Sequence, residues 1–198
     1  MPRRPKRKRP RKDNEQQLYC WGDNAHSQLG IGDGVGQQRE PVRVDLKRWT
    51  DVVASQAFSC GIAEDGELFC WGSGEFGRTA RGRPQIRTTP GRARSPFDRY
   101  TQLSAGWFSA CGTREDRSVW CWGRNAEGQL GVEDTADRDR PTRMSNIEAS
   151  QVAVGRFFTC ILTYEGEVAC VGRNSLSQLG AFTEEEQVSS LIFQKGWR

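Results

Sequence analysis

Histidine is almost absent from this 198-residue sequence, which contains only His26. Because no Cys-x-x-Cys spacing occurs either, a tetrahedral zinc site lacks both its ligands and their spacing. His26 lies in a turn segment, where we interpret it as a polar turn residue rather than a partner for a nucleophile. The sequence also lacks a P-loop, a Gly-x-Ser-x-Gly elbow and the dinucleotide-binding glycine pattern. We therefore predict that the protein is not an enzyme and needs no metal or other cofactor.

Long apolar runs are missing as well. No stretch approaches the roughly 20 apolar residues that cross a bilayer, so we expect no membrane span. The N-terminus is charged but lacks the apolar segment of a signal peptide. A hydrophobic content of 35% with 22 glycines and 7 tryptophans favours a turn-rich all-β protein over a helical one.

Acidic residues are absent from the first twelve positions, which carry eight positive charges. Because the whole chain has a formal charge of +4, the rest sums to −4 and the basic character belongs to this segment. We predict that residues 1–16 form a disordered basic tail, which can bind nucleic acid through residues 3–12 or address the protein to the nucleus. The alternatives are a solvated arm, or a start codon assigned upstream of the true one. The charged residues are Arg3, Arg4, Lys6, Arg7, Lys8, Arg9, Arg11 and Lys12.

An internal repeat fills the remainder of the chain. Cys-Trp-Gly or Cys-Val-Gly triplets start at Cys20, Cys70, Cys121 and Cys170, at intervals of 50, 51 and 49 residues. Three of the triplets continue to Gln-Leu-Gly, while the copy from Cys70 is degenerate. A fifty-residue unit has room for about four short strands, which is one blade of a β-propeller.

Two repeated positions have a physical interpretation. Asn24, Asn125 and Asn174 align with Gly74, and this alternation of Asn and Gly predicts a left-handed backbone position. A tryptophan follows the cysteine in three copies, which favours packing within or between blades over a ligand site. These tryptophans are Trp21, Trp71 and Trp122.

The pattern Gly-x-Asn-x-x-Gly/Ser-Gln-Leu-Gly, a following Pro-containing strand and an Ala-Gly-x-x-x-x-Cys segment resemble the regulator of chromosome condensation repeat. The prolines are Pro41, Pro90 and Pro141, and one copy of the segment runs from Ala105 to Cys111. The resemblance covers residues 17–198 and implies propeller blades; the complete family fold is a closed seven-bladed ring. With three to four blades here, we expect an open or partial ring. Similar proteins include nucleotide exchange factors, ubiquitin-ligase modules, photoreceptors and secreted bacterial inhibitors.

Six of the seven cysteines form pairs that are ten residues apart across a hairpin turn. With the turn centred on Asp65, Cys60 faces Cys70 at a non-hydrogen-bonded position, where the Cα atoms lie about 4.5 Å apart and a disulfide fits. The alternative is that these cysteines are reduced and pack as small apolar residues. We favour disulfides and hence an extracytoplasmic or secreted protein, against a nuclear or cytoplasmic one. The predicted pairs are Cys60–Cys70, Cys111–Cys121 and Cys160–Cys170.

Cys20 is the odd cysteine, because the position ten residues before it is Pro10. We predict that Cys20 remains a thiol. We also expect the first and last blades to be incomplete, with Leu18–Trp21 at an open edge through which the chain self-associates.

Two segments are candidates for partner binding. Residues 78–94 hold six arginines and no acid, and the segment is expected to face solvent and to bind an acidic protein surface, carboxylate or phosphate. Trp107 lies in a loop at a position that varies between repeats, as a protein-contact anchor would. The arginines are Arg78, Arg81, Arg83, Arg87, Arg92 and Arg94.

The function predicted from these features is non-enzymatic binding of an unidentified protein by propeller loops. One alternative is guanine-nucleotide exchange, by analogy with the founding member of the family. Another is nucleic-acid binding through the basic tail and the arginine-rich loop.

Overall fold

The computed structural model describes residues 9–12, 15–33, 36–96, 99–180 and 186–193. These residues form antiparallel β-strands in four sheets, which confirms the all-β prediction. Within the described ranges, the only helical element is the 3-10 turn η1 (Glu75–Gly77), and no helix is long and apolar enough to cross a membrane.

Each sheet is one propeller blade, in which strands that are consecutive in sequence are neighbours in space. The first sheet contains β1 (Arg9–Lys12), β2 (Leu18–Asp23) and β3 (Gln37–Arg43). The second contains β4 (Trp49–Ala54), β5 (Phe58–Ala63), β6 (Leu68–Gly72) and β7 (Arg87–Arg92). The third contains β8 (Tyr100–Ala105), β9 (Ser109–Arg114), β10 (Ser118–Gly123) and β11 (Arg138–Glu148). The fourth contains β12 (Gln151–Val154), β13 (Phe158–Leu162), β14 (Val168–Arg173) and β15 (Gln187–Phe193).

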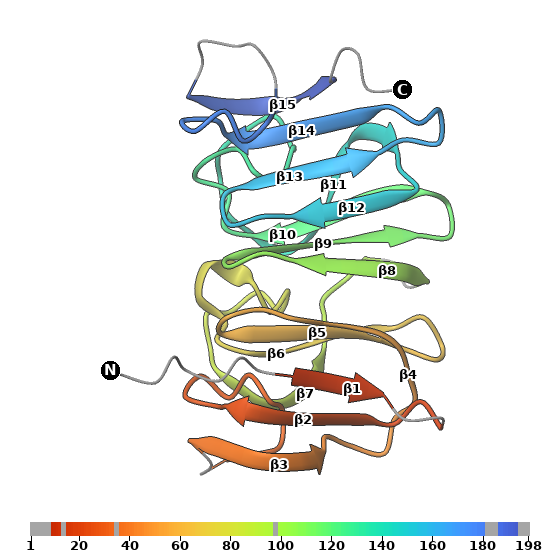
Figure 1. Cartoon of the computed structure of the whole chain (residues 1–198), viewed down its shortest axis with the longest axis vertical. Coiled ribbons are helices and arrows are strands. Elements are labelled where there is room, and N and C mark those ends of the chain that lie inside the picture. The colour runs from red at the N-terminus through yellow and green to blue at the C-terminus, as the bar shows by residue number, and fades with distance from the viewer. Residues whose placement is uncertain (1–8, 13–14, 34–35, 97–98, 181–185, 194–198) are drawn as a thin grey trace.

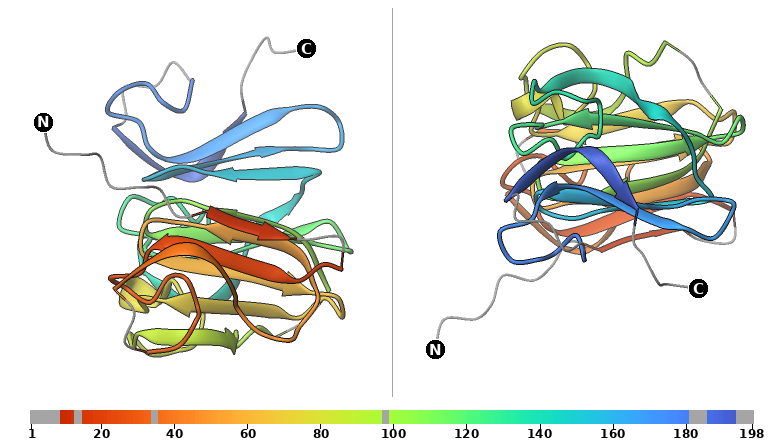
Figure 2. Two further views of the ribbon diagram at one scale, coloured as in Figure 1. Left: turned by 60° about the horizontal axis from the view of Figure 1, so that its bottom comes forward. Right: turned by 90° about the horizontal axis from the view of Figure 1, so that it is seen from above.

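The sheets follow one another in an arc, from β3 at one end to β15 at the other (Figures 1 and 2). Side chains join the first strands of successive blades: the Leu103 N–H donates to Asp51 Oδ2 at 2.7 Å, and the Val154 N–H to Ser104 Oγ at 2.9 Å. No strand pairing among the described residues links the first sheet to the fourth. The ring is therefore not closed, as the number of repeats predicts.

The hairpin of each of the last three blades carries a disulfide. Cys60 faces Cys70, Ile62 faces Leu68, and the Ala63 N–H donates to the Glu67 carbonyl at 3.0 Å, which is the predicted register. The Cα atoms of the paired cysteines are 4.1 Å apart in all three hairpins. The predicted pairs Cys60–Cys70, Cys111–Cys121 and Cys160–Cys170 are thus present in the structure.

The repeated asparagine acts through its side chain, so the prediction of a left-handed backbone at this position is wrong. The Oδ1 atoms of Asn24 and Asn125 each accept the N–H of the leucine five residues later at 2.9 Å, closing the turns that follow β2 and β10. Asn174 makes the same bond at 3.1 Å. The left-handed residue lies three positions further on, for example Ser27 with φ of 59°. The aligned Gly74 has φ of −92° and is required for space, because a Cβ there would lie 2.4 Å from the Gln85 carbonyl oxygen.

Strand β1 changes two expectations about the N-terminal segment. Arg9–Lys12 pair with β2, so the predicted disorder is wrong for these four residues, while residues 1–8 and 13–14 lie outside the described part of the chain. The predicted open edge at Leu18–Trp21 is wrong too, because β2 pairs with β1 on one side and with β3 on the other. Pro10 faces Cys20, and the Cys20 side chain is 1% exposed.

Two of the repeated tryptophans couple neighbouring blades. The indole N–H of Trp71 donates to the Gln28 carbonyl at 3.0 Å, and that of Trp122 donates to the Arg78 carbonyl at 3.1 Å. Both indoles are fully buried, whereas Trp21, at the outer side of the first sheet, is half-buried. The interpretation of these tryptophans as packing residues is confirmed at Trp71 and Trp122.

Candidate functional site

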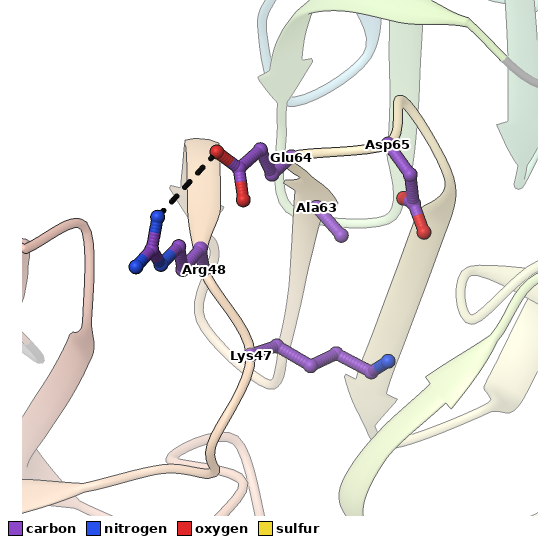
Figure 3. A pocket seen from close by; sticks show the side chains of 5 residues that line it. All are labelled: Lys47, Arg48, Ala63, Glu64 and Asp65. Carbon is purple, nitrogen blue, oxygen red and sulfur yellow. Dashed lines mark ion pairs between the residues drawn. The ribbon is translucent and has the colours of Figure 1, made fainter.

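The turn of the β5–β6 hairpin borders a hollow of about 300 Å³ (Figure 3). Arg48 and Glu64 point toward each other across its rim, with Nη1 and Oε1 3.8 Å apart, and both side chains are more than half exposed. The lining mixes charges of both signs and offers no set of converging donors or acceptors. We assign no function to this hollow. Its residues are Lys47, Arg48, Ala63, Glu64 and Asp65.

The six arginines of residues 78–94 do not all lie in one cluster. Four of its six arginines line a single hollow of about 200 Å³, together with Thr79 and Gln85. We call this set the arginine pocket: Thr79, Arg81, Arg83, Gln85, Arg87 and Arg94.

Arg78 and Arg92 do not belong to the pocket. Arg78 is 4% exposed, so its expected exposure to solvent is wrong. Its Nη2 atom donates to Ser73 Oγ and to Glu75 Oε2, both at 2.7 Å, and its carbonyl accepts the indole of Trp122. Burial is the main reason why the pKa of Arg78 is lowered from its ordinary value, and the neighbouring Glu75 carboxylate opposes that effect. Arg92 is exposed and forms an ion pair with Glu67 at 3.0 Å.

A second cluster lies at one end of the propeller. There, loops that join the first and second strands of a blade lie beside loops that follow the third strands. Trp107 and Phe108 come from the β8–β9 loop, Phe157 from the β12–β13 loop and Phe76 from η1. The Phe108 ring stacks on that of Phe157 with centroids 5.7 Å apart and an interplanar angle of 20°. Phe76 and Trp107 each approach the Phe108 ring in a T-shaped arrangement, at 5.9 and 6.2 Å.

Four guanidinium groups lie over these rings, and that of the buried Arg78 is 5.9 Å from the Phe76 centroid. That of Arg124 lies 5.5 to 5.6 Å from the centroids of Phe76, Phe108 and Phe157. That of Arg156 lies 4.1 Å from the Trp107 ring and 4.8 Å from Phe157, which Arg173 approaches at 5.7 Å. We call this set the aromatic–arginine ladder: Phe76, Trp107, Phe108, Arg124, Arg156, Phe157 and Arg173.

The ladder is accessible to a partner. Trp107 and Phe76 are 42% and 40% exposed, unlike the fully buried tryptophans of the blade core. Arg156 and Arg173 are exposed, and Arg124 lies 4.0 Å from Glu127. Large aromatic rings and arginines are the residues most enriched at the centres of protein interfaces.

The sequence singled out only Trp107 from this ladder. Arg156-Phe157 occupies the same repeat position as Trp107-Phe108, so this part of the signal was present in the alignment of the repeats. Phe76 lies in the degenerate copy, where it adopts φ of 57°. The sequence alone could not place Phe76, Arg124 or Arg173 beside the loop that carries Trp107.

Among the described residues, few side chains have the surroundings of a catalytic or metal-binding group. No group of three or more His, Cys, Asp or Glu side chains there is placed to hold a metal ion. His26 is exposed in its turn. The two carboxylates with a lowered pKa are explained by local bonds: Asp116 first by Ser118, and Asp134 first by Arg138.

The fold and the repeat define a β-propeller repeat protein. Sequence profiles of the regulator of chromosome condensation (RCC1) repeat match residues 15–62 and 116–162 and, in a second form, residues 49–78, 100–129 and 149–178. The chain belongs to the RCC1 repeat family.

Curated relatives share part of the chain. It is 30% identical over 130 residues to the ultraviolet-B receptor UVR8 of Arabidopsis thaliana, covering 63% of this chain and 29% of that protein. It is 26% identical over 143 residues to the human E3 ubiquitin-protein ligase HERC2, covering 70% of this chain and 3% of that one. The chain therefore spans less than a third of either relative.

Solved structures show the same fold. Yeast RCC1 (Prp20), in its complex with Kap60, superposes with a TM-score of 0.86 at 18% identity, over 97% of this chain and 47% of that one. Human WBSCR16 superposes with a TM-score of 0.83 at 21% identity, over 94% of this chain and 51% of that one. The four sheets thus correspond to about half of an RCC1 propeller.

Proposed function

We propose that this chain is a non-enzymatic protein-binding module and that the aromatic–arginine ladder is its contact surface. The observation that carries the proposal is the exposure of Trp107 and Phe76 within a stack of rings and guanidinium groups. A tryptophan that packs only a blade interior would be buried, as Trp71 and Trp122 are.

The ladder is suited to a protein partner for two reasons. Its rings are held by one another and by Arg124, so little conformational entropy is lost when a partner covers them. Its exposed cations, Arg156 and Arg173, favour a partner that presents carboxylates around an apolar centre. A complex of yeast RCC1 with Kap60 gives precedent within the family for protein binding.

The compartment is part of the proposal. Three disulfides between the central strands of three blades support an extracytoplasmic or secreted protein, because such bonds persist in oxidising compartments. Nucleotide exchange and nucleic-acid binding are the alternatives. No described feature favours exchange, and most of residues 3–12, the proposed nucleic-acid contact, lie outside the described residues.

Photo-crosslinking tests the contact surface. A photoreactive amino acid at position 107 should crosslink a defined protein from the native source, whereas the same probe at Leu46, which is 85% exposed and outside the ladder, should not. Arg156→Glu, with the probe at 107, should remove the crosslink, because it reverses the charge beside the probe. The same products from both probe positions, or an unchanged product with Arg156→Glu, would refute the proposal.

A further inference from the structure

The arginine pocket is a feature separate from the ladder. Arg81 and Arg83 come from the loop after η1, Arg87 begins β7, and Arg94 follows that strand. These four arginines, with Gln85, line one hollow of about 200 Å³. Four arginines, whose guanidinium groups carry five N–H donors each, therefore line a space large enough for a small anion.

Backbone hydrogen bonds fix the segment that carries these arginines. The Arg94 N–H donates to the Ala80 carbonyl at 2.7 Å, and the Gly82 N–H donates to the Asp139 carbonyl of the next blade at 3.0 Å. The Arg81 side chain is held by the carbonyl of Arg92, to which its Nη1 donates. The backbone that carries the arginines and the side chain of Arg81 are thus positioned before any ligand arrives, which lowers the entropic cost of binding.

The positive charge of the pocket is not compensated. None of its four guanidinium groups forms an ion pair with a carboxylate in the described part of the chain. Asp139, whose carbonyl accepts the Gly82 N–H, has its ion-pair contact with Arg140 at 3.9 Å. The pKa of Arg81 is lowered from its ordinary value, first by partial burial and then by repulsion from Arg87 and Arg94.

The wall of the pocket also holds an unsatisfied hydroxyl. Thr79 is fully buried, and among the described residues its Oγ1 has no hydrogen-bond partner. In the three regular repeats this position is a buried leucine, namely Leu29, Leu130 or Leu179. The degenerate copy has the smaller, polar Thr79 there, beside the hollow that the four arginines line.

We propose that the arginine pocket binds the phosphate group of a small molecule. A phosphate carries close to two negative charges near neutral pH and offers three terminal oxygens to several guanidinium forks, whereas a carboxylate carries one charge and occupies a single fork. A nucleic acid would follow a stripe of cations along its backbone, whereas these cations line one hollow. The ligand is therefore either a free phosphate or diphosphate, or an organic phosphate ester.

Calorimetry with the purified chain tests the proposal, with inorganic phosphate, pyrophosphate, glucose 6-phosphate and citrate as probes at matched ionic strength. We expect phosphate-bearing probes to bind and citrate to bind at least tenfold more weakly than pyrophosphate. A higher affinity for glucose 6-phosphate than for phosphate assigns the site to organic esters, and the reverse assigns it to the free ions. Citrate binding as tightly as pyrophosphate, or no binding of any phosphate probe, overturns the proposal.

Variants separate the pocket from the basic N-terminal residues, which also attract anions. Arg87→Gln and Arg94→Gln should each weaken pyrophosphate binding by about tenfold or more, because each removes a charged donor. Arg39→Gln is the control: it removes the same charge from an exposed position on β3 of the first blade and should leave the affinity unchanged. Equal losses in all three variants would show that the anion responds to net charge, and would overturn the pocket assignment. Since Trp107 is not in the pocket, the ladder proposal is unaffected by that outcome.

Discussion

The indole N–H of Trp71 and the carbonyl of Gln28 form a hydrogen bond of 3.0 Å across the boundary between the first and second blades. Ser59 Oγ donates to the same carbonyl at 2.7 Å. The next boundary has the same arrangement with Trp122 and Arg78, but the last has Val171 in place of tryptophan. The contacts between blades are therefore made by side chains of the repeat, although they differ from one boundary to the next.

Replacing Trp71 with phenylalanine should lower the free energy of unfolding by about 1–3 kcal/mol, since it removes the bond to Gln28 and part of a fully buried ring. Urea unfolding followed by circular dichroism measures the change. Trp21→Phe, at the half-buried equivalent position, should cost less. Equal costs for the two variants would show that the boundary contact does not contribute.

The repeated asparagine allows a test of side-chain against backbone effects. Asn125 is fully buried, accepts the Leu130 N–H at 2.9 Å and donates to the Asp134 carbonyl at 2.7 Å. Asn125→Gly should therefore lower the free energy of unfolding by about 1–3 kcal/mol, because buried groups lose their partners. If the position instead required a left-handed backbone, glycine would be neutral or stabilising, and thermal unfolding distinguishes the two results.

The fold was accessible from the sequence because its signals repeat. The spacing of Cys60 and Cys70 predicted their register, and the fifty-residue interval predicted the blades. The chemistry of the asparagine position was not accessible, since an alternation of Asn and Gly indicates a left-handed backbone as readily as a side-chain bond in three copies and a crowded glycine in the fourth. The composition of the N-terminal segment also misled, because the disorder expected from its charge and proline content ignores the pairing that β2 offers to residues 9–12.

The binding sites were harder to predict than the fold. The charge run at residues 78–94 indicated a cationic surface, but only the folded loop separates the buried Arg78 from the four arginines of the pocket. The ladder combines residues from three blades and from two kinds of loop. Such contacts are long-range, and a repeat pattern does not encode them.

The disulfides make a quantitative prediction. Replacing both Cys60 and Cys70 with alanine should cost about 2–3 kcal/mol of stability, because the ten-residue separation closes a short loop in the unfolded chain. Peptide mapping without reductant should recover the three cross-linked peptides. Cys20 should be alkylated only after denaturation, since it is 1% exposed. Rapid alkylation of all seven cysteines in the native protein would contradict this prediction.

The β9–β10 turn should give a pH-dependent contribution to stability. The pKa of Asp116 is lowered from its ordinary value, chiefly by hydrogen bonds from Ser118, so its carboxylate stabilises the folded state. That contribution is present above the ordinary pKa of aspartate and is lost as the pH falls through the lowered value. Asp116→Asn should thus cost less than about 1 kcal/mol near neutral pH and nothing at strongly acidic pH, as urea titrations would show. A difference that grows on acidification would contradict the assigned sign.

The outer side of the first blade should support self-association of the isolated chain. Trp21 is half-buried there, whereas the equivalent Trp71 and Trp122 are covered by a preceding blade. Sedimentation velocity should show species larger than a monomer as concentration rises, and Trp21→Arg should shift the distribution toward monomer. An unchanged distribution in this variant would place the association elsewhere.

The pairing of Pro10 with Cys20 gives the blades unequal responses to reductant. In the other three blades a disulfide joins the two central strands, so reduction removes a covalent link from each. The first blade has a proline at that position, so no disulfide joins these two strands. Under reducing conditions the contrast between the blades disappears, and under oxidising conditions hydrogen exchange is expected to begin in the first blade and proceed along the arc.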